Sequence, residues 1–217
     1  AGDAGRVIIS SRKPVLIENP DAAPDTGEGL DRGEFIDNIR NRDVAFGDET
    51  GALSLAKGGG NTDGITIAAP SITMKGAGIY SVTSKNETGD LGNSGNISLR
   101  TGTAILENAR VLLGSGLSAE PAESGINVLA QNGISLAKQS YLFSGAGLSV
   151  SGEVAIVEGS LVEAQQSEVT LGSGMKLSAN SAWNSDSLEI DSPVLEVFQS
   201  TIQYEDEAAI NLARDCL

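Results

Sequence analysis

The sequence of 217 residues contains no histidine, one cysteine and few aromatic residues: one Trp, three Tyr and four Phe. Without histidine, the chain cannot form a Ser-His-Asp triad, a Cys-His pair or a His-rich zinc site. The one thiol, Cys216, has no second cysteine to pair with, so a disulfide within the chain is excluded. We interpret Cys216 as a loose terminal thiol, and we expect no resident metal and no cofactor.

Basic residues are also scarce, with 14 Lys and Arg against 29 Asp and Glu, for a formal net charge of −15. Nucleic acids and anionic membrane surfaces are bound mainly through Lys and Arg, so both kinds of partner are disfavoured. No run of the sequence is long and apolar enough to span a bilayer. We therefore predict no nucleic-acid partner and no membrane insertion.

The chain begins at Ala1 without a methionine and enters directly on a repeated pattern. We therefore expect it to be a piece of a longer protein.

A unit of three short segments recurs along the chain and is clearest between Gly95 and Leu113. Each segment has inward positions two residues apart, which is the period of a β-strand with one buried face. The third segment begins seven residues after the second in all six units, and nearly all of the length variation follows the third. The segments of the first face begin at Ile65, Ile97, Ile126, Leu148, Val169 and Leu188, those of the second at Ile72, Ala104, Ile134, Val154, Met175 and Leu195, and those of the third at Ile79, Val111, Tyr141, Leu161, Ala182 and Ile202.

A repeat of about 20 to 30 residues is typical of a solenoid, in which one unit stacks on its copies. Three strands per turn with polar corners predict an all-β fold, a parallel β-helix of triangular section with about seven turns. We expect residues 1–217 to form one such domain. The second inward position is regularly apolar on the first two faces and less regular on the third; it is Ile67, Leu99, Val128, Val150, Leu171 and Ile190 on the first face and Met74, Leu106, Leu136, Ile156, Leu177 and Val197 on the second.

Residues 18–52 interrupt the first turn and differ from the rest of the chain. They contain ten acidic residues, three arginines and two of the four phenylalanines, Phe35 and Phe46. A loop this long inside a compact fold is usually functional or disordered. Residues 31–42 could form a short helix with Phe35, Ile36 and Ile39 on one side. The carboxylates could bind Ca²⁺ or form a solvated acidic loop, and their spacing lacks the alternating Asp/Asn pattern of an EF-hand.

The last residues, from Glu205, have acids followed by apolar positions. This order suits a short helix with its acids at the positive N-terminal end. We expect residues 205–217 to cap the end of the solenoid, because terminal repeats commonly need a polar cover.

The outward positions are where a function would be added to such a fold. On the first face they form a polar ladder of Thr66, Ser98, Asn127, Ser149, Thr170 and Glu189. On the third face five of six are apolar, a longer exposed stripe than monomeric proteins usually leave bare: Tyr80, Leu112, Leu142, Val162, Trp183 and Gln203.

Three explanations of this apolar stripe remain open. The loops of that corner or the 18–52 insertion could cover it, it could be a groove with Tyr80 and Trp183 as stacking platforms, or the register assigned to that face could be wrong. The candidate ligand-binding residues are accordingly Tyr80, Leu112, Leu142, Trp183, Phe35 and Phe46.

A phrase recurs at residues 2–9 (Gly-Asp-Ala-Gly-Arg-Val-Ile-Ile), 60–67 (Gly-Asn-Thr-Asp-Gly-Ile-Thr-Ile) and 92–99 (Gly-Asn-Ser-Gly-Asn-Ile-Ser-Leu). It resembles the repeats of filamentous-haemagglutinin-like exoproteins, the passengers of two-partner secretion systems. The resemblance is clear in three turns and fades to bare periodicity by Leu148. It implies a right-handed β-helix that crosses the outer membrane through a transporter partner and serves in adhesion, and it brings no catalytic residues with it.

The favoured function is therefore a secreted or cell-surface adhesin or structural passenger, not an enzyme, whose partner is a glycan or protein on a host or neighbouring cell. One alternative is a carbohydrate-active enzyme, because β-helices also host polysaccharide lyases and hydrolases. Such a site needs carboxylates that converge on one groove, and the candidates Glu163, Glu189 and Glu196, with Lys176, are assigned to different faces. A third possibility is an inert stalk that separates other parts of a longer protein.

Overall fold

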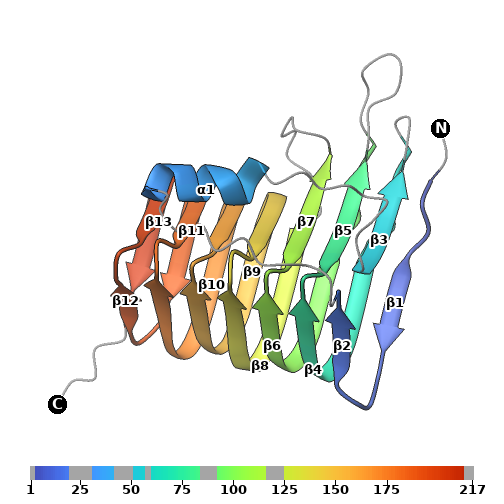
Figure 1. Cartoon of the computed structure of the whole chain (residues 1–217), viewed down its shortest axis with the longest axis horizontal. Helices are drawn as coiled ribbons and strands as arrows, with labels where there is room; N and C mark the ends of the chain where they lie inside the picture. The colour runs from blue at the N-terminus through green and yellow to red at the C-terminus, as the bar shows by residue number, and fades with distance from the viewer. Residues whose placement is uncertain are drawn as a thin grey trace.

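A computed structural model describes residues 3–19, 31–41, 51–56, 60–83, 92–115 and 125–212. In these residues the fold is all-β, with a single helix and one 13-stranded sheet of parallel strands in sequence-neighbour order (Figure 1). This arrangement is consistent with a β-solenoid. The helix is too short to cross a membrane.

The strands form three stacks. The first stack is formed by parts of β1 (Val7–Ser10), β4 (Ile65–Lys75), β6 (Ile97–Glu107), β8 (Gly125–Ala137), β9 (Tyr141–Glu158), β10 (Leu161–Ser178), β11 (Ala182–Asp191) and β13 (Thr201–Asn211). All of these strands except β1 continue around a corner, so other parts of them belong to the second or third stack. The second stack consists of β2 (Val15–Glu18), the later parts of β4, β6, β8, β9 and β10, and β12 (Leu195–Val197). The third stack consists of β3 (Gly51–Ala56), β5 (Gly78–Thr83), β7 (Arg110–Ser115) and the first parts of β9, β10, β11 and β13.

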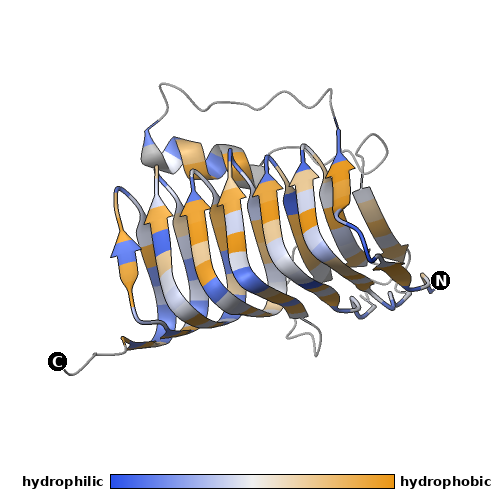
Figure 2. Cartoon of the chain, turned by 90° about the horizontal axis from the view of Figure 1, so that it is seen from below, coloured by the Kyte–Doolittle hydropathy of each residue, from blue (hydrophilic) through white to orange (hydrophobic). Residues whose placement is uncertain are grey.

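The core lies between the three stacks and is built from residues at alternate positions. Within β4, for example, Ile65, Ile67, Ile72 and Met74 are all buried. Side chains of one kind recur at matching positions on neighbouring strands, as the repeated hydrophobic bands in Figure 2 show. The predicted inward positions of the first two faces are confirmed from β4 through β8.

The recurring Gly-Asn phrase lies at the corner that leads into the first stack. The backbone N–H of Asn61 donates to Asp3 Oδ1 at 2.8 Å, and the N–H of Asn93 donates to Asn61 Oδ1 at 2.8 Å. Because each side chain accepts from the equivalent residue one repeat further on, the three residues tie successive corners together. Gly64 follows with φ of +83°, in the left-handed region that favours glycine.

The register predicted for the third face is wrong by one residue at Tyr141, Leu161 and Ala182, and it is correct again at Ile202. In the structure Val111 pairs with Leu142, which pairs with Val162, and Val162 pairs with Trp183. A shift of one residue turns every side chain to the opposite face of a strand. Leu142, Val162 and Trp183 therefore point into the core, where they are buried.

At Tyr141 and Ala182 the cause of this shift is the length of the corner between the second and third stacks. At Leu161 it follows from the shift of the second-face residues of β9, whose first inward residue is Ala155. Some corners contain a single residue at positive φ, such as Asn108 (+49°) or Gly159 (+53°). There, the first inward residue of the third-stack segment follows the first inward residue of the second-stack segment by seven positions. Two corners contain two such residues, Lys138 with Gln139 and Ala179 with Asn180, and the spacing there becomes eight. The constant spacing of seven was thus an incorrect prediction.

Two further register predictions are corrected by the pairing. On the second face the inward residues of β9 are Ala155 and Val157 instead of Val154 and Ile156. On the first face Leu148 pairs with Ser167, so the first inward column continues through a serine. Val169, two residues later in the chain, occupies the second inward column. The outward ladder consequently contains Glu168 in place of Thr170.

Helix α1 (Arg32–Asn41) confirms the helix predicted inside the 18–52 insertion. Asp31 and Glu34 form a capping box at its start, since Asp31 Oδ1 accepts from the Glu34 N–H at 3.0 Å and Glu34 Oε2 accepts from the Asp31 N–H at 3.2 Å. Helix α1 lies beside the C-terminal strands (Figure 1). Its residues Phe35 and Ile39 are buried against outward side chains of the third stack, namely Tyr141, Leu161 and Ala182. Helix α1 therefore covers part of the apolar outward surface of the third stack.

The helix predicted for residues 205–217 is wrong over the described part, because residues 201–211 form strand β13. Ala208 and Ile210 pair with Leu188 and Ile190 and continue the first-stack columns. Pairing with the open edge of β11 outweighs the helical propensity of the segment. Residues 213–217 lie outside the described residues.

Candidate functional site: a polar groove along the first stack

The residues predicted to bind a ligand on the third face do not form an open surface. Leu142 and Trp183 point into the core, and Tyr80 is buried with its ring over Gly78. Leu112 packs beside the cluster under α1, and Phe35 is a member of that cluster. Phe46 lies outside the described residues. The stripe is therefore partly interior and partly covered, and it is not a platform for stacking.

In the described part of the chain, an open groove runs along the outer side of the first stack; we call it the axial groove. Two hollows of about 570 and 660 Å³ lie along it. They share Asn96, Asn127 and Ser149, so together they form one continuous depression across several strands. Its other polar lining residues are Arg6, Asp63, Thr66, Ser98, Arg100, Ser151, Gln166, Ser167, Glu168, Ser187 and Glu189.

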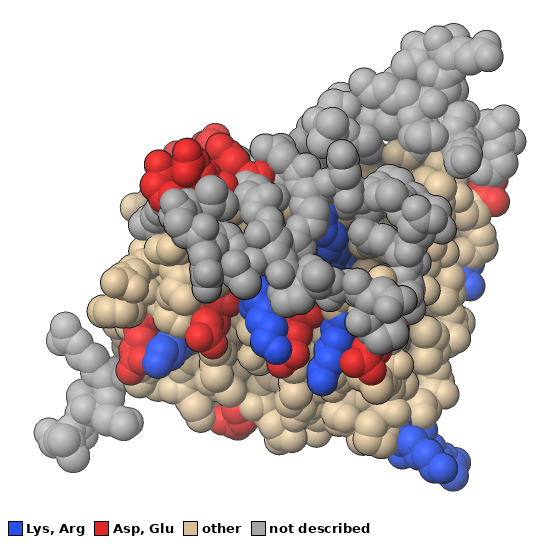
Figure 3. Space-filling view, in the orientation of Figure 1, with Lys and Arg blue, Asp and Glu red and all other residues tan. Residues whose placement is uncertain are grey.

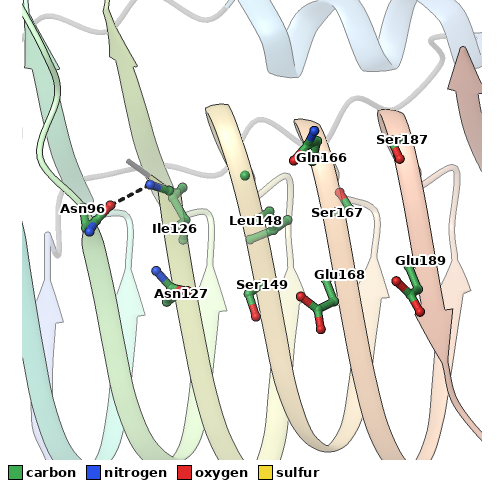
Figure 4. A pocket seen from close by; sticks show the side chains of 12 residues that line it. Asn96, Ile126, Asn127, Leu148, Ser149, Gln166, Ser167, Glu168, Ser187 and Glu189 are labelled. Carbon is green, nitrogen blue, oxygen red and sulfur yellow. Dashed lines mark hydrogen bonds between the residues drawn. The ribbon is translucent and has the colours of Figure 1, made fainter. Parts of the chain in front are cut away.

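The floor of the groove is a row of polar side chains that lie directly opposite one another on successive strands. The row runs through Thr66, Ser98, Asn127, Ser149, Glu168 and Glu189. Figure 4 shows its later members side by side on neighbouring strands. Because parallel strands are about 4.8 Å apart, the row presents one hydroxyl, amide or carboxylate at each such step. The strands, which belong to the core on their inner side, hold this row rigidly.

The two ends of the groove differ in charge. Two bases, Arg6 and Arg100, and one acid, Asp63, line one end, where Arg6 donates to Thr66 Oγ1 at 3.3 Å. Glu168 and Glu189 occupy the other end, directly opposite each other on β10 and β11. On the rim, Asn96 Oδ1 accepts from the Gly125 N–H at 2.7 Å, which fixes the amide (Figure 4). The groove is thus a graded polar surface without an aromatic platform.

The carboxylates considered for an enzyme do not converge. Glu163 belongs to the third stack, where it accepts from Tyr141 Oη at 2.7 Å and from Asn184 Nδ2 at 3.2 Å. Glu196 belongs to the second stack, and its distance to Lys176 Nζ is 3.9 Å with both side chains exposed. Of the three glutamates considered from the sequence, only Glu189 lies in the axial groove.

Glu163 lines a separate hollow of about 380 Å³ together with Asp186 and Glu205. Across the described ranges, no three acidic or cysteine side chains are grouped as a metal site requires. The sequence did not identify Glu168 as a neighbour of Glu189, because Ser167 occupies an inward position that the apolar pattern passes over. Their spacing of 21 residues, one full repeat, was the available signal.

Comparison with known proteins yields no match: no family model, no curated protein and no solved structure is similar to this chain at a significant level.

Proposed function

We propose that this chain is a right-handed, three-faced parallel β-helix of about seven turns from an exported cell-surface protein. Support comes from the three stacks of parallel strands, from the side-chain ladder formed by the Gly-Asn phrase, and from the strong preference of parallel crossovers for the right hand. The resemblance of that phrase to filamentous-haemagglutinin-like repeats supports export through an outer-membrane transporter.

The function we propose is attachment, with the axial groove as the binding surface for an extended glycan on a host or neighbouring cell. The observation that carries this proposal is the row of hydroxyl, amide and carboxylate groups along the groove floor. A polysaccharide laid along the row would exchange hydrogen bonds with water for hydrogen bonds with side chains already held in place, which lowers the entropy lost on binding. Binding would be spread along the groove.

The experiment is binding to a glycan array and to immobilised extracellular matrix, with two matched variants. Ser149→Tyr fills the middle of the axial groove, and Ser135→Tyr adds the same side chain at an outward position of the second stack. We expect Ser149→Tyr to abolish glycan binding and Ser135→Tyr to retain it. Point variants are preferable to removal of residues 18–52, because that removal would uncover Tyr141 and Leu161.

Equal binding by both variants would move the site away from the groove. If the unaltered chain binds no glycan and no matrix protein, it is an inert stalk, and the adhesive function is withdrawn.

One observation favours a second candidate, a carbohydrate-active enzyme. Glu168 and Glu189 lie opposite each other on neighbouring strands within the groove, and retaining glycosidases use two carboxyl groups about 5 to 5.5 Å apart. Incubation with neutral and acidic polysaccharides, followed by assays for reducing ends and for unsaturated products, tests this. Turnover by the unaltered chain that is lost in both Glu168→Gln and Glu189→Gln would favour the enzymatic function. If no substrate is turned over, attachment stays the proposed function.

A further inference from the structure

Arg100 on β6 is an exposed basic residue without an acidic neighbour. It lies opposite Ala68 on β4 and Leu129 on β8, and neither of these strands contains an acid. In the described part of the chain Arg100 makes no hydrogen bond and no ion pair. The described lysines of the second stack differ, since each lies beside an acid: Lys75 and Lys138 beside Glu107, and Lys176 beside Glu196. The guanidinium N–H groups of Arg100 are therefore available to an anion.

Leu129 is the apolar side chain beside this guanidinium. It is 48% exposed, and no other described large apolar side chain between residues 60 and 190 is as exposed. A single exposed leucine needs no explanation. Leu129 and Arg100, however, lie directly opposite each other on strands about 4.8 Å apart, and both line the same hollow of the axial groove. The pair thus offers a cation and an apolar contact side by side.

Polar side chains without protein partners lie next to this pair. Ser98 and Asn127 precede Arg100 and Leu129 by two residues, so they lie on the same outward face. Ser149 continues their row on β9, beside Asn127 (Figure 4). The side chains of Ser98, Asn127 and Ser149 make no hydrogen bond in the described ranges. Their hydroxyl and amide groups can therefore bind sugar hydroxyls without breaking a bond within the protein.

The acids of the groove lie away from Arg100. Glu168 is on β10, three strands along the stack from β6, which is about 14 Å at about 4.8 Å per strand. This exceeds the Debye length of about 8 Å at physiological ionic strength, so an anion at Arg100 is largely screened from Glu168 and from the more distant Glu189. Asp63 lines the opposite border of the hollow, five residues before the row of Arg100. An acid on every sugar would bring some of them beside the two glutamates, so the groove suits one acidic sugar followed by uncharged ones.

We propose that Arg100 and Leu129 form a subsite for an acidic sugar that carries an acetyl group, at one end of a glycan whose other sugars are uncharged. This inference rests on the proposed attachment function and specifies its ligand. The guanidinium binds the carboxylate through paired N–H···O bonds, and the acetyl methyl packs on Leu129. Two sources share this chemistry, a terminal N-acetylneuraminic acid and an O-acetylated uronic acid.

The test is isothermal titration calorimetry of the whole chain with matched oligosaccharides. The first set is N-acetylneuraminyl-lactose, its N-glycolyl form, in which a hydroxyl is added to the methyl, and lactose, which lacks the acid. We expect the acetyl form to bind roughly threefold more tightly than the glycolyl form, as burial of one methyl group implies. Lactose should bind roughly tenfold more weakly or less, because it lacks a charge-assisted hydrogen bond.

A second set distinguishes the two sources. It consists of a lactose-based trisaccharide that ends in a uronic acid, with and without an O-acetyl group. The acidic sugar whose acetylated form binds more tightly is the source of the ligand. Equal binding of lactose and of all the acidic sugars would overturn the subsite.

Variants assign the two contacts to their residues. Arg100→Gln should weaken binding of the acidic trisaccharide roughly tenfold and leave lactose unchanged, and Leu129→Asn should remove the preference for acetyl over glycolyl. Lys176→Gln and Leu16→Asn make the same changes at exposed positions of the second stack and should bind as the unaltered chain does. Far-UV circular dichroism establishes that each variant is folded.

The outcomes separate this subsite from the attachment function. Glycan binding that Ser149→Tyr abolishes but Arg100→Gln leaves unchanged would overturn the subsite, while attachment through the groove stands. Binding that the Lys176→Gln control weakens as much as Arg100→Gln would overturn it too, because the effect would then come from net charge. If the unaltered chain binds no glycan at all, the attachment function fails and the subsite fails with it.

Discussion

Trp183 Nε1 donates a hydrogen bond to Ser167 Oγ at 3.1 Å inside the sheet's core. Both residues are buried, and Ser167 occupies a column whose neighbouring members are Leu148 and Leu188. A serine in an apolar column is accounted for by this bond, because a buried indole N–H requires an acceptor. The pair also fixes the register between β10 and β11.

Ser167→Ala should therefore destabilise the fold, although it makes the column more apolar. Loss of the acceptor leaves the indole N–H unsatisfied, which costs about 1 to 3 kcal/mol. Urea unfolding followed by fluorescence measures the loss, since Trp183 is the only tryptophan in the chain. For Trp183→Phe, which lacks the fluorophore, urea unfolding is followed by far-UV circular dichroism instead. The double variant Ser167→Ala/Trp183→Phe completes a double-mutant cycle for this hydrogen bond. A Ser167→Ala variant as stable as the unaltered chain would contradict this assignment.

The same serine shows why the sequence specified the architecture better than the register. Period-two apolar residues located the strands and the inward columns as far as β8, because every inward position there is apolar or small. At Ser167 the inward residue is polar, so the apolar pattern placed the start of that segment at Val169. A buried hydrogen bond to a residue 16 positions away is invisible to a search for periodicity.

The corners explain the larger error. A second left-handed residue at Gln139 or Asn180 lengthens a corner by one position, and neither is a glycine that would have signalled it. Leu142 and Trp183 were consequently assigned to the surface. The polar ladder of the first face was predicted apart from Glu168, but the hollows along it are a property of the folded surface that a list of residues does not contain.

Two glycines of β9 provide a matched pair for testing the sheet's close packing. A Cβ at Gly152 would overlap the carbonyl oxygen of Ala130 on the neighbouring strand, whereas a Cβ at Gly147 would have no atom within 4 Å. We expect Gly152→Ala to cost about 1 to 3 kcal/mol, as overpacking usually does, and Gly147→Ala to cost little. Thermal and urea unfolding of the two variants should differ clearly. Equal stabilities would show that β8 and β9 are not in the register described.

The contact between α1 and the third stack predicts a local effect of substitutions in the insertion. Phe35→Ala and Ile39→Ala each remove a buried side chain, which typically costs about 2 to 5 kcal/mol in a core. Because only the helix depends on these contacts, we expect α1 to detach while the sheet remains. A rise in binding of a hydrophobic dye, with an unchanged Trp183 unfolding midpoint, is the expected signature.

Gly33→Ala is the control for this effect, because Gly33 is exposed on α1 and alanine favours the helix. Dye binding should stay at the level of the unaltered chain. A joint collapse of helix and sheet in Phe35→Ala would instead show that α1 is required for the whole fold.

The second stack carries opposite charges on neighbouring strands, which predicts a salt-dependent contribution to stability. Glu18 lies opposite Lys75, and Lys75 lies opposite Glu107, which Lys138 Nζ approaches to 2.9 Å. Figure 3 shows acidic and basic side chains alternating in a row across the face in view. Exposed ion pairs contribute about 0.2 to 1 kcal/mol, so Lys138→Gln should cost no more than this, and the loss should vanish in high salt. Lys176→Gln is the matched control, because the 3.9 Å pair with Glu196 is looser and more exposed, and its loss should be smaller. Urea titrations at low and high salt measure both differences. A loss for Lys138→Gln that persists in high salt would mean that the methylene stem of Lys138 stabilises the corner by packing, and that its charge contributes little.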